Sequence, residues 1–285
     1  MDLFFLVWYN FITAIRARPY SRCGQPRRVR TDMLGEMSGM IQSVVRAVEI
    51  LRCFEDAEML GVSEIAVKLG LNKSTAFGLV STLASTGLLE RDGETGRYRL
   101  GLELFRLGNQ VNASLRRLVV QELSELSAQV EETVNFVQPE GGNVIYVVKQ
   151  ESPHSMRICT KIGQRLPMYC TAVGKAILAF RPEAEQKQII RGFAYRAFTR
   201  STVTTDQRLL EDLAWIRREG YAVEREELEY GLVCVAAPIL DAGGRAIAAI
   251  SCSGPEGRMT NEKIVQCRDA LLKCAGRLAE VNLGL

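Results

Sequence analysis

The sequence predicts an α+β protein in which a small helical unit precedes a larger unit built on an antiparallel sheet. Two observations lead to this fold class. Residues 41–100 show short amphipathic helices and then two short runs around a glycine turn. The rest of the chain places strands before and after a group of helices, which is typical of an antiparallel sheet layered against helices. With 285 residues, 47% of them hydrophobic and 24% charged, the chain can bury the cores of two domains.

We expect residues 1–40 to be a disordered extension outside the fold. An apolar and aromatic run at residues 3–15 precedes a stretch rich in arginine. The run is shorter than the roughly 20 residues that span a bilayer, and it lacks the basic leading end and the cleavage site of a secretory signal. Amphipathic attachment to a membrane is the alternative. We favour an extension ahead of a start at Met33, Met37 or Met40, in a cytoplasmic protein with no membrane partner.

The first unit begins with two helices bounded by capping signals. Ser43–Phe54 carries apolar residues at helical spacing. Ser63 is expected to cap the next helix, with Val62 and Val67 as its hydrophobic staple. Gly70 is expected to end that helix in the left-handed conformation, which glycine adopts without strain.

A third helix follows after a turn of two residues, with Asn72 as its N-cap. Residues 88–91 and 97–100 flank a turn that contains glycine, and this pattern predicts a β-hairpin. Helix, short glycine turn, helix and hairpin make up a winged helix-turn-helix at residues 41–100. In that motif the second helix of the turn enters the major groove of DNA. The core stripe of this helix is expected to be Ala76, Leu79, Val80 and Leu83.

DNA contacts are expected at the start of the same helix. Lys73 suits a phosphate, whereas Ser74 and Thr75 can reach phosphates or base edges. The Thr75 methyl group and Phe77 can touch thymine methyl groups. Gly78 costs about 1 kcal/mol of helix propensity, which close approach of a packed helix or of DNA would explain. A helical domain with no DNA role is the alternative, because a net charge of +3 does not by itself indicate a nucleic-acid partner. The predicted DNA-contacting set is Arg46, Lys73, Ser74, Thr75, Phe77, Gly78 and Arg97.

Residues 101–113 are expected to form a linker helix and residues 114–285 a second domain. This domain is predicted to open with the helix Leu115–Glu131, and Ile158 is placed in a further short strand. Residues 163–167 indicate an irregular approach to the next helix. The other predicted elements are a hairpin at 133–148, helices at 171–180, 183–191 and 206–219, strands at 221–225, 233–240 and 246–253, and a closing helix at 262–281.

The cysteines argue against a disulfide framework and a metal centre. There are eight, with no C-x-x-C pair, and one histidine, His154. We therefore expect reduced thiols, no metal and no cofactor. Two alternatives remain. A thiol-based redox sensor would need an exposed cysteine of low pKa, and an enzyme with a cysteine nucleophile would have only His154, in a loop, as its histidine base. The candidate nucleophiles are Cys170, Cys234 and Cys252.

From about Ile41 to its end, the chain resembles the isocitrate lyase regulator (IclR) family of bacterial transcription factors. The segments that carry the resemblance run in the family's order: SVVRAVEILRCF, VSEIAVKLGLNKSTAFGLVSTLASTGLLERD, ETGRYRLG, GQRLPMYCTAVGKAILA, EREELEYGLVCVAAPILD and AAISCSGP. The resemblance implies a winged helix-turn-helix, a linker helix and an effector-binding domain with a GAF-like fold, without enzymatic activity. It also implies a homodimer or homotetramer on palindromic double-stranded DNA, repressing a catabolic operon under the control of a small molecule.

The effector site is expected between the start of the helix at 171–180 and the strand at 246–253. Thr171 can cap that helix, whose free N–H groups suit a carboxylate, so we expect a small organic acid. Ser251 and Ser253 share one face of the strand because they are two residues apart. Matching the family's motif positions places Leu166, Ala172 and Val173 at this edge of the pocket, and Leu232, Cys234 and Glu224 come from the neighbouring strand and its approach. The predicted effector-binding set is Ile158, Leu166, Ala172, Val173, Glu224, Leu232, Cys234, Ser251 and Ser253.

Several of these residues have a plainer structural interpretation. The two serines could bond to backbone or water, and Cys234 could be a small buried apolar residue. Glu224 belongs to a charged run at 224–227, and such runs are more often solvated surface. The sequence also departs from the family's pattern in two places, which leaves the ligand polarity and the operator sequence open. Glu224 stands where members often carry Asp, and Gly78 replaces a bulkier, often basic residue.

Overall fold

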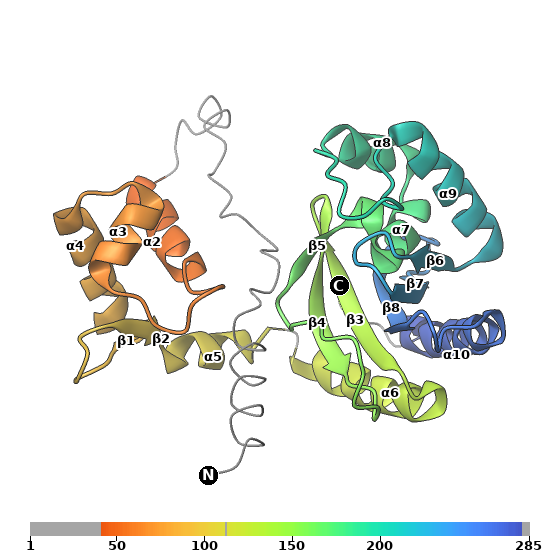
Figure 1. The fold of residues 1–285 in the computed structure, drawn as a ribbon, viewed down its shortest axis with the longest axis horizontal. Coiled ribbons are helices and arrows are strands. Elements are labelled where there is room, and N and C mark those ends of the chain that lie inside the picture. The colour runs from red at the N-terminus through yellow and green to blue at the C-terminus, as the bar shows by residue number, and fades with distance from the viewer. Residues whose placement is uncertain (1–40, 112, 281–285) are drawn as a thin grey trace, which may run out of the picture. The chain divides into compact units, whose positions relative to one another are not determined.

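The computed structural model describes residues 41–111 and 113–280, and the chain divides into two compact units, Met1–Gly108 and Asn109–Leu285 (Figure 1). The extension expected at residues 1–40 lies outside the described residues. Within those described stretches, every helix is too short or too polar to cross a membrane.

The described part of the first unit is a winged helix-turn-helix with a short helix after it. Its core is closed by buried apolar side chains from the three helices of the motif and from the hairpin, among them Ile50, Ile65, Val80 and Leu89. The hairpin pairs Leu89 with Leu100 in antiparallel register. The elements are α2 (Gln42–Arg52), α3 (Val62–Leu69), α4 (Lys73–Ser85), β1 (Leu89–Arg91), β2 (Tyr98–Leu100) and α5 (Leu102–Gly108).

The start of α3 differs from the prediction. Gly61 is the N-cap, and its backbone N–H donates to Oε2 of Glu64 at 2.6 Å. Because this carboxylate satisfies a free N–H of the first turn, the helix begins before Ser63, which lies inside it. Val67 is exposed, so the predicted staple with Val62 is also wrong.

The other boundary signals of this motif are confirmed. Gly70 ends α3 in the left-handed conformation, with φ of 64°. Asn72 caps α4, and its Oδ1 accepts from the Thr75 backbone N–H at 2.9 Å. These two residues fix the turn between α3 and α4, and therefore the direction of α4 relative to α3.

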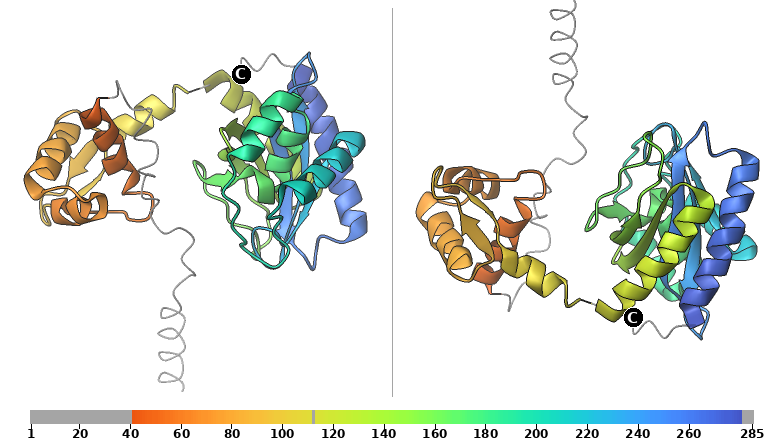
Figure 2. Two further views of the ribbon diagram at one scale, coloured as in Figure 1. Left: turned by 90° about the horizontal axis from the view of Figure 1, so that it is seen from above. Right: turned by 90° about the horizontal axis from the view of Figure 1, so that it is seen from below.

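The second unit is a six-stranded antiparallel sheet in the order β5-β4-β3-β8-β7-β6. Helices cover both of its faces, and α6 and α10 lie side by side over one of them (Figure 2). The elements are α6 (Ala113–Val130), β3 (Thr133–Glu140), β4 (Asn143–Gln150), β5 (Arg165–Pro167), the 3-10 helix η2 (Met168–Cys170), α7 (Ala172–Ala179), α8 (Glu183–Arg191), α9 (Asp206–Glu219), β6 (Ala222–Arg225), β7 (Leu232–Leu240), β8 (Ala246–Pro255) and α10 (Asn261–Glu280).

The two faces of the sheet serve different cores. Alternate residues such as Val134, Ile250 and Cys252 pack with α6 and α10. The residues between them face α7 and α9, where Ala236 and Ala249 leave room for close packing of α7. Polar side chains gather on this second face, as described below.

Ile158 does not lie in a strand. It belongs to an irregular segment at 151–164, and its carbonyl accepts from the Thr133 hydroxyl at 3.3 Å. The short strand comes later, at β5, where residues 163–167 had been expected to be irregular. There Leu166 pairs with Val144 of β4 and is buried, which fixes β5 at the sheet edge.

Candidate DNA interface and effector site

The first turns of α4 present most of the predicted DNA-contacting residues to solvent. Lys73, Ser74 and Gly78 are exposed, and Phe77 keeps 57% of its surface exposed although it is a large apolar side chain. Thr75 is half-buried, with its N–H engaged by the Asn72 cap. Four of these five residues therefore form one exposed surface at the start of the helix.

A hollow of about 610 Å³ borders this surface. Lys73, Ser74 and Phe77 line it together with the start of α3 and with Gly96 of the hairpin turn. Three segments of the motif thus meet where α4 begins. The structure does not place Arg46 or Arg97 among the residues that line this hollow.

Arg97, at the base of the hairpin, forms hydrogen bonds within the domain. Its Nη2 donates to the Met59 carbonyl and to Glu64 Oε1, each at 3.0 Å. The guanidinium thereby ties the hairpin to the start of α3. Arg46 is half-buried on α2. DNA contact by these two arginines stays a prediction.

Gly78 is not required by packing within its unit. A Cβ atom built at this position meets no heavy atom within 4 Å. Of the two explanations offered for glycine in mid-helix, close packing of a neighbouring helix is therefore wrong for the described unit. Close approach to DNA stays a prediction.

In the second unit, four neighbouring strands bring polar side chains into one row. The antiparallel register pairs Glu224 with Cys234, Cys234 with Ser253, and Ser253 with Thr133. Directly opposed residues share a face of the sheet. The thiol of Cys234 lies 3.2 Å from the Ser253 hydroxyl and donates to it. Glu224 and Ser253 are almost fully buried, so the row is an internal polar feature.

A second row lies two residues along the same strands. Ser251 is opposite Asn135, and Asn135 is opposite Lys149 of β4. The Asn135 amide donates to the Ser251 hydroxyl at 3.4 Å and accepts from the Thr160 hydroxyl at 2.7 Å. Lys149 donates to the Thr160 carbonyl at 2.8 Å. The segment at 151–164 therefore closes over this row.

Asn135, Lys149 and Thr160 are absent from the predicted site. The signal for Asn135 was an amide among apolar residues in a strand, between Val134 and Phe136. Thr160 and Lys149 carried no comparable signal, because their place depends on the pairing of β3 with β4 and on the path of an irregular segment.

The remaining predicted residues of the sheet are apolar. Leu166 of β5 and Leu232 of β7 are buried, and Leu232 lies two residues before Cys234 on the same face of β7. Tyr146 is buried on the same side of the sheet, and burial raises the pKa of its hydroxyl. Ile158 is half-buried in the irregular segment.

The N-terminus of α7 is capped as predicted. Thr171 Oγ1 accepts from the Gly174 N–H at 3.2 Å, and Ala172 and Val173 are buried. A Cβ atom at Gly174 would lie 2.3 Å from Cα of Met168, so glycine is needed for α7 to pack against η2. The free N–H groups of this helix start are thus held inside the domain.

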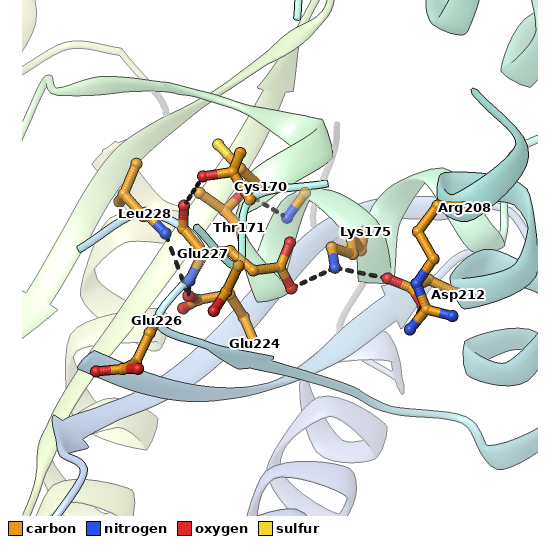
Figure 3. A network of polar contacts seen from close by, with 12 residues as sticks. Cys170, Thr171, Lys175, Arg208, Asp212, Glu224, Glu226, Glu227 and Leu228 are labelled. Atoms are coloured by element: carbon orange, nitrogen blue, oxygen red, sulfur yellow. Dashed lines mark hydrogen bonds and ion pairs between the residues drawn. The ribbon is translucent and has the colours of Figure 1, made fainter. Parts of the chain in front are cut away.

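Glu224 is a buried carboxyl rather than part of a solvated run. Its Oε1 accepts from the backbone N–H groups of Glu227 and Leu228 (Figure 3). Burial raises the pKa of Glu224 to about 7, against the lowering effect of the Glu227 N–H. Within the charged run, Arg225 is exposed and Glu226 is half-buried, whereas Glu224 and Glu227 point inward.

The cation nearest to this carboxyl pair is Lys175 of α7, which is itself buried. Its Nζ lies 2.5 Å from Glu227 Oε1 and 2.8 Å from Asp212 Oδ2 (Figure 3). Burial raises the pKa of Glu227, and the positive charge of Lys175 opposes that rise. Lys175 therefore compensates Glu227 and Asp212, while Glu224 has backbone donors and no cation among its hydrogen-bond partners within the described residues.

Two family models match the chain and together span both units. The model described as the bacterial transcriptional regulator IclR C-terminal domain matches residues 110–280. The model described as the IclR helix-turn-helix domain matches residues 43–93. The chain belongs to the IclR family.

Characterised relatives and a solved structure agree with the family models. The HTH-type transcriptional regulator KdgR of Escherichia coli (strain K12) is 33% identical over 253 residues, which cover 88% of this chain and 96% of the relative. The transcriptional repressor IclR of the same strain is 30% identical over 243 residues, covering 84% and 89%. The crystal structure of Thermotoga maritima IclR matches with a TM-score of 0.70 and 32% identity, covering 86% of this chain and all of that one.

Membership of the IclR family tests the predicted fold class and the predicted function. The predicted fold class, a helix-turn-helix domain followed by an antiparallel α+β domain, is confirmed. The chain is a DNA-binding transcriptional regulator, as its relatives are, and the alternative of a cysteine-dependent enzyme is wrong.

The pKa values of the cysteine thiols in this IclR-family chain can be compared with what a thiol-based redox sensor requires. Burial raises the pKa of the Cys170 thiol to about 12 and also raises that of Cys234. The hydrogen bond between Cys252 and Cys267, whose Sγ atoms lie 3.2 Å apart, raises the pKa of Cys252 and lowers that of Cys267. Both members of the pair are fully buried. Cys267, the thiol with the lowered pKa, is therefore not exposed, whereas a redox sensor needs an exposed thiol of low pKa.

Proposed function

We propose that this protein represses a catabolic operon and that a small organic acid, bound on the α7 face of the sheet, controls its binding to DNA. The observation that carries the proposal is the pair of buried polar rows. Ser251, Ser253, Asn135 and Glu224 are each at most 3% exposed, yet they lie on a face that otherwise packs apolar residues. Polar groups gathered inside an apolar region are what a small-ligand site uses for orientation.

An organic acid fits the charges around these rows. The start of α7 offers backbone N–H groups and the positive end of a helix dipole, while Ser251 and Ser253 offer hydroxyl donors. With a pKa near 7, Glu224 can hold a proton and donate it in a hydrogen bond to the ligand. The predicted residues Leu166, Leu232 and Ala172 supply apolar walls.

The DNA half of the proposal rests on α4. Its exposed start supplies Lys73 for a phosphate and Ser74 and Thr75 for phosphates or base edges, and it leaves Phe77 free to meet thymine methyl groups. Repression, rather than activation, is supported by the relative that is called a transcriptional repressor. An operator-bound protein of this kind would work in the cytoplasm.

Exposed apolar side chains on α2 and α5 support a homodimer or homotetramer on a palindromic operator. Val44 and Val48 of α2 are exposed, and Leu102 and Phe105 of α5 keep 80% and 70% of their surfaces exposed. Exposed apolar side chains of this size often mark a contact with another protein chain. A two-fold protein matches two half-sites about one helical turn apart, or a multiple of that distance.

A thermal-shift screen tests the effector half of the proposal. Small organic acids that stabilise the full-length protein should lose most of that effect in the double variant Ser251→Ala with Ser253→Ala. The control replaces two exposed serines outside the sheet, Ser85→Ala with Ser124→Ala, and should respond like the parent. Acids that stabilise parent and double variant equally would place the effector elsewhere.

A further inference from the structure

A cavity of about 560 Å³ lies between α9 and β6, outside the polar rows. None of the predicted effector-binding residues lines it. Its floor is buried and contains Val203, Ile216, Lys175 and Glu227. Trp215 of α9 forms one wall, with 37% of its surface exposed and its ring edge-to-face against Tyr221 at 5.2 Å.

The floor holds an acceptor that lacks a well-formed hydrogen bond. Glu227 is 7% exposed, and its Oε1 is bound by Lys175. Its Oε2 is buried, and no donor among the described residues makes a well-formed hydrogen bond to it. The backbone N–H of Val203 acts on this carboxyl and lowers its pKa, so it is the donor that faces the group from the protein. A buried carboxylate oxygen without a well-formed hydrogen bond is costly and therefore rare. The floor is thus prepared for a group that brings a hydrogen-bond donor.

The rim holds a positive charge that lacks an anion. Arg225 of β6 is exposed, and its Nη2 donates to Asn261 Oδ1 at 3.1 Å. Across residues 41–111 and 113–280 no carboxylate forms an ion pair with it, whereas Arg208 is shared between Glu211 and Asp212. Arg225 is therefore the cation at this rim that is free to meet an anionic group.

The charges of the cavity are separated by depth. Toward the floor, the single positive charge of Lys175 meets two carboxylates, the buried Glu227 and the half-buried Asp212, and Asp212 also pairs with Arg208 of the rim. The inner end of the cavity therefore has an excess of negative charge. At the rim, Arg208 and Arg225 oppose Glu211, which leaves about +1. A ligand that is neutral overall but positive at its inner end and negative at its outer end matches this arrangement.

We propose that the cavity is a second ligand site, which takes a small zwitterion with its ammonium group on Glu227 and its carboxylate toward Arg225. The aliphatic part of such a ligand would pack against Trp215 and Val223. The site adjoins the polar rows through one residue, because the Glu227 backbone N–H donates to Glu224 while its side chain lines the cavity (Figure 3).

Fluorescence of Trp215 gives a local readout in the full-length protein. The sequence holds two tryptophans, so Trp8→Phe leaves Trp215 as the single emitter. We would titrate this protein with glycine, 4-aminobutanoate and 6-aminohexanoate, and with butanoate and butylamine as ligands that carry one charge only. At least one zwitterion should give a saturable change. Butanoate and butylamine should each bind at least about tenfold more weakly, because each leaves one charged group of the site unpaired.

Variants then locate the ligand. Arg225→Gln should weaken the zwitterion about tenfold or more, and Glu227→Gln should do the same. Glu227 is buried, so its variant can lose the fold. The binding affinity of the Arg225→Gln variant, whose side chain is exposed, is therefore the deciding measurement. The matched control is Arg217→Gln, which removes an exposed arginine of α9 that does not line the cavity, and it should bind like the parent.

Three results would overturn the second site. One is the absence of a saturable response to any of the three zwitterions. Another is equal affinity of Arg225→Gln and the parent. The third is loss of zwitterion binding in the Ser251→Ala, Ser253→Ala variant with no loss in Arg225→Gln, which would move the ligand to the polar rows. Because this last result separates the two sites, failure of the second site would leave the proposed function standing.

Discussion

At the scale of single residues, Glu224 couples the candidate site to pH. Its pKa is about 7 in the folded protein, against 4.5 for an exposed glutamate, because it is buried. The folded state therefore keeps a proton that the unfolded state has lost between those two values. With respect to this group, the free energy of unfolding is highest at low pH and falls as pH rises through 7.

Replacing the Glu224 carboxyl with an amide should remove the contribution of this group to the pH dependence of the unfolding free energy. Between pH 5 and pH 8 the parent should lose about 2 kcal/mol more unfolding free energy than Glu224→Gln, measured by urea denaturation. The exposed Glu229→Gln is the control and should follow the parent. Equal pH dependence in parent and Glu224→Gln would show that Glu224 is charged in the fold at neutral pH.

Residue patterns predicted part of the site and missed the rest for a physical reason. Ser251 and Ser253 were placed on one face because alternation along a strand is local. Asn135 and Lys149 belong to the same site only because β3 lies between β8 and β4, and the pairing of β3 with β8 joins segments more than a hundred residues apart. The burial of Glu224 likewise depends on the chain that closes over it.

At the scale of elements, the glycines of α4 and α7 are opposite cases. Gly174 sits against Met168 with no room for a Cβ atom, whereas Gly78 faces open space. Gly174→Ala should therefore lower the free energy of unfolding by about 1–3 kcal/mol through overpacking. Gly78→Ala should raise it by up to about 1 kcal/mol through helix propensity. Denaturation curves of the two variants check this, and a loss of stability in Gly78→Ala would contradict it.

The proposed docking of α4 makes a separate prediction for DNA. Lys73→Ala should weaken binding to all sequences and flatten the dependence of log affinity on log salt by about one, because one phosphate contact is lost. Thr75→Ala and Phe77→Ala should instead reduce the preference for the operator over other DNA. Salt titrations of operator and non-operator duplexes measure both effects, with Lys187→Ala of α8 as the control. A Lys73→Ala protein with unchanged affinity and salt slope would rule out this docking.

Elements were predicted more securely than their edges. Apolar periodicity located the helices α4, α9 and α10 because a helix repeats over many residues. The errors fell on short features. The start of α3 was displaced because Glu64 caps it from inside the helix, and β5 was missed because three residues are too few to show alternation.

At the scale of the whole molecule, the chain combines a DNA-binding unit and a sheet domain, and residues 1–40 stand apart from the proposed function. A chain that begins at Met33 should fold, dimerise and bind the same DNA as the full-length protein. Circular dichroism, sedimentation and gel shifts compare the two. Loss of folding or of membrane recovery on truncation would give the apolar N-terminal run a role of its own.

Control of DNA binding by the sheet requires that the effector has different affinities for the DNA-competent and incompetent states. Such coupling typically changes operator affinity about 5- to 150-fold. The linker helix α5, at Leu102–Gly108, joins the two units along the chain and is the element expected to carry it.

The most direct test of this account is the operator affinity of the Ser251→Ala, Ser253→Ala variant, measured by gel shift with and without an organic acid that stabilises the parent. The duplex would be the intergenic region upstream of the protein's own gene. We predict that the variant binds the operator like the unliganded parent and that the acid no longer changes its affinity. A variant that responds to the acid like the parent, or that no longer binds the operator at all, would contradict the account.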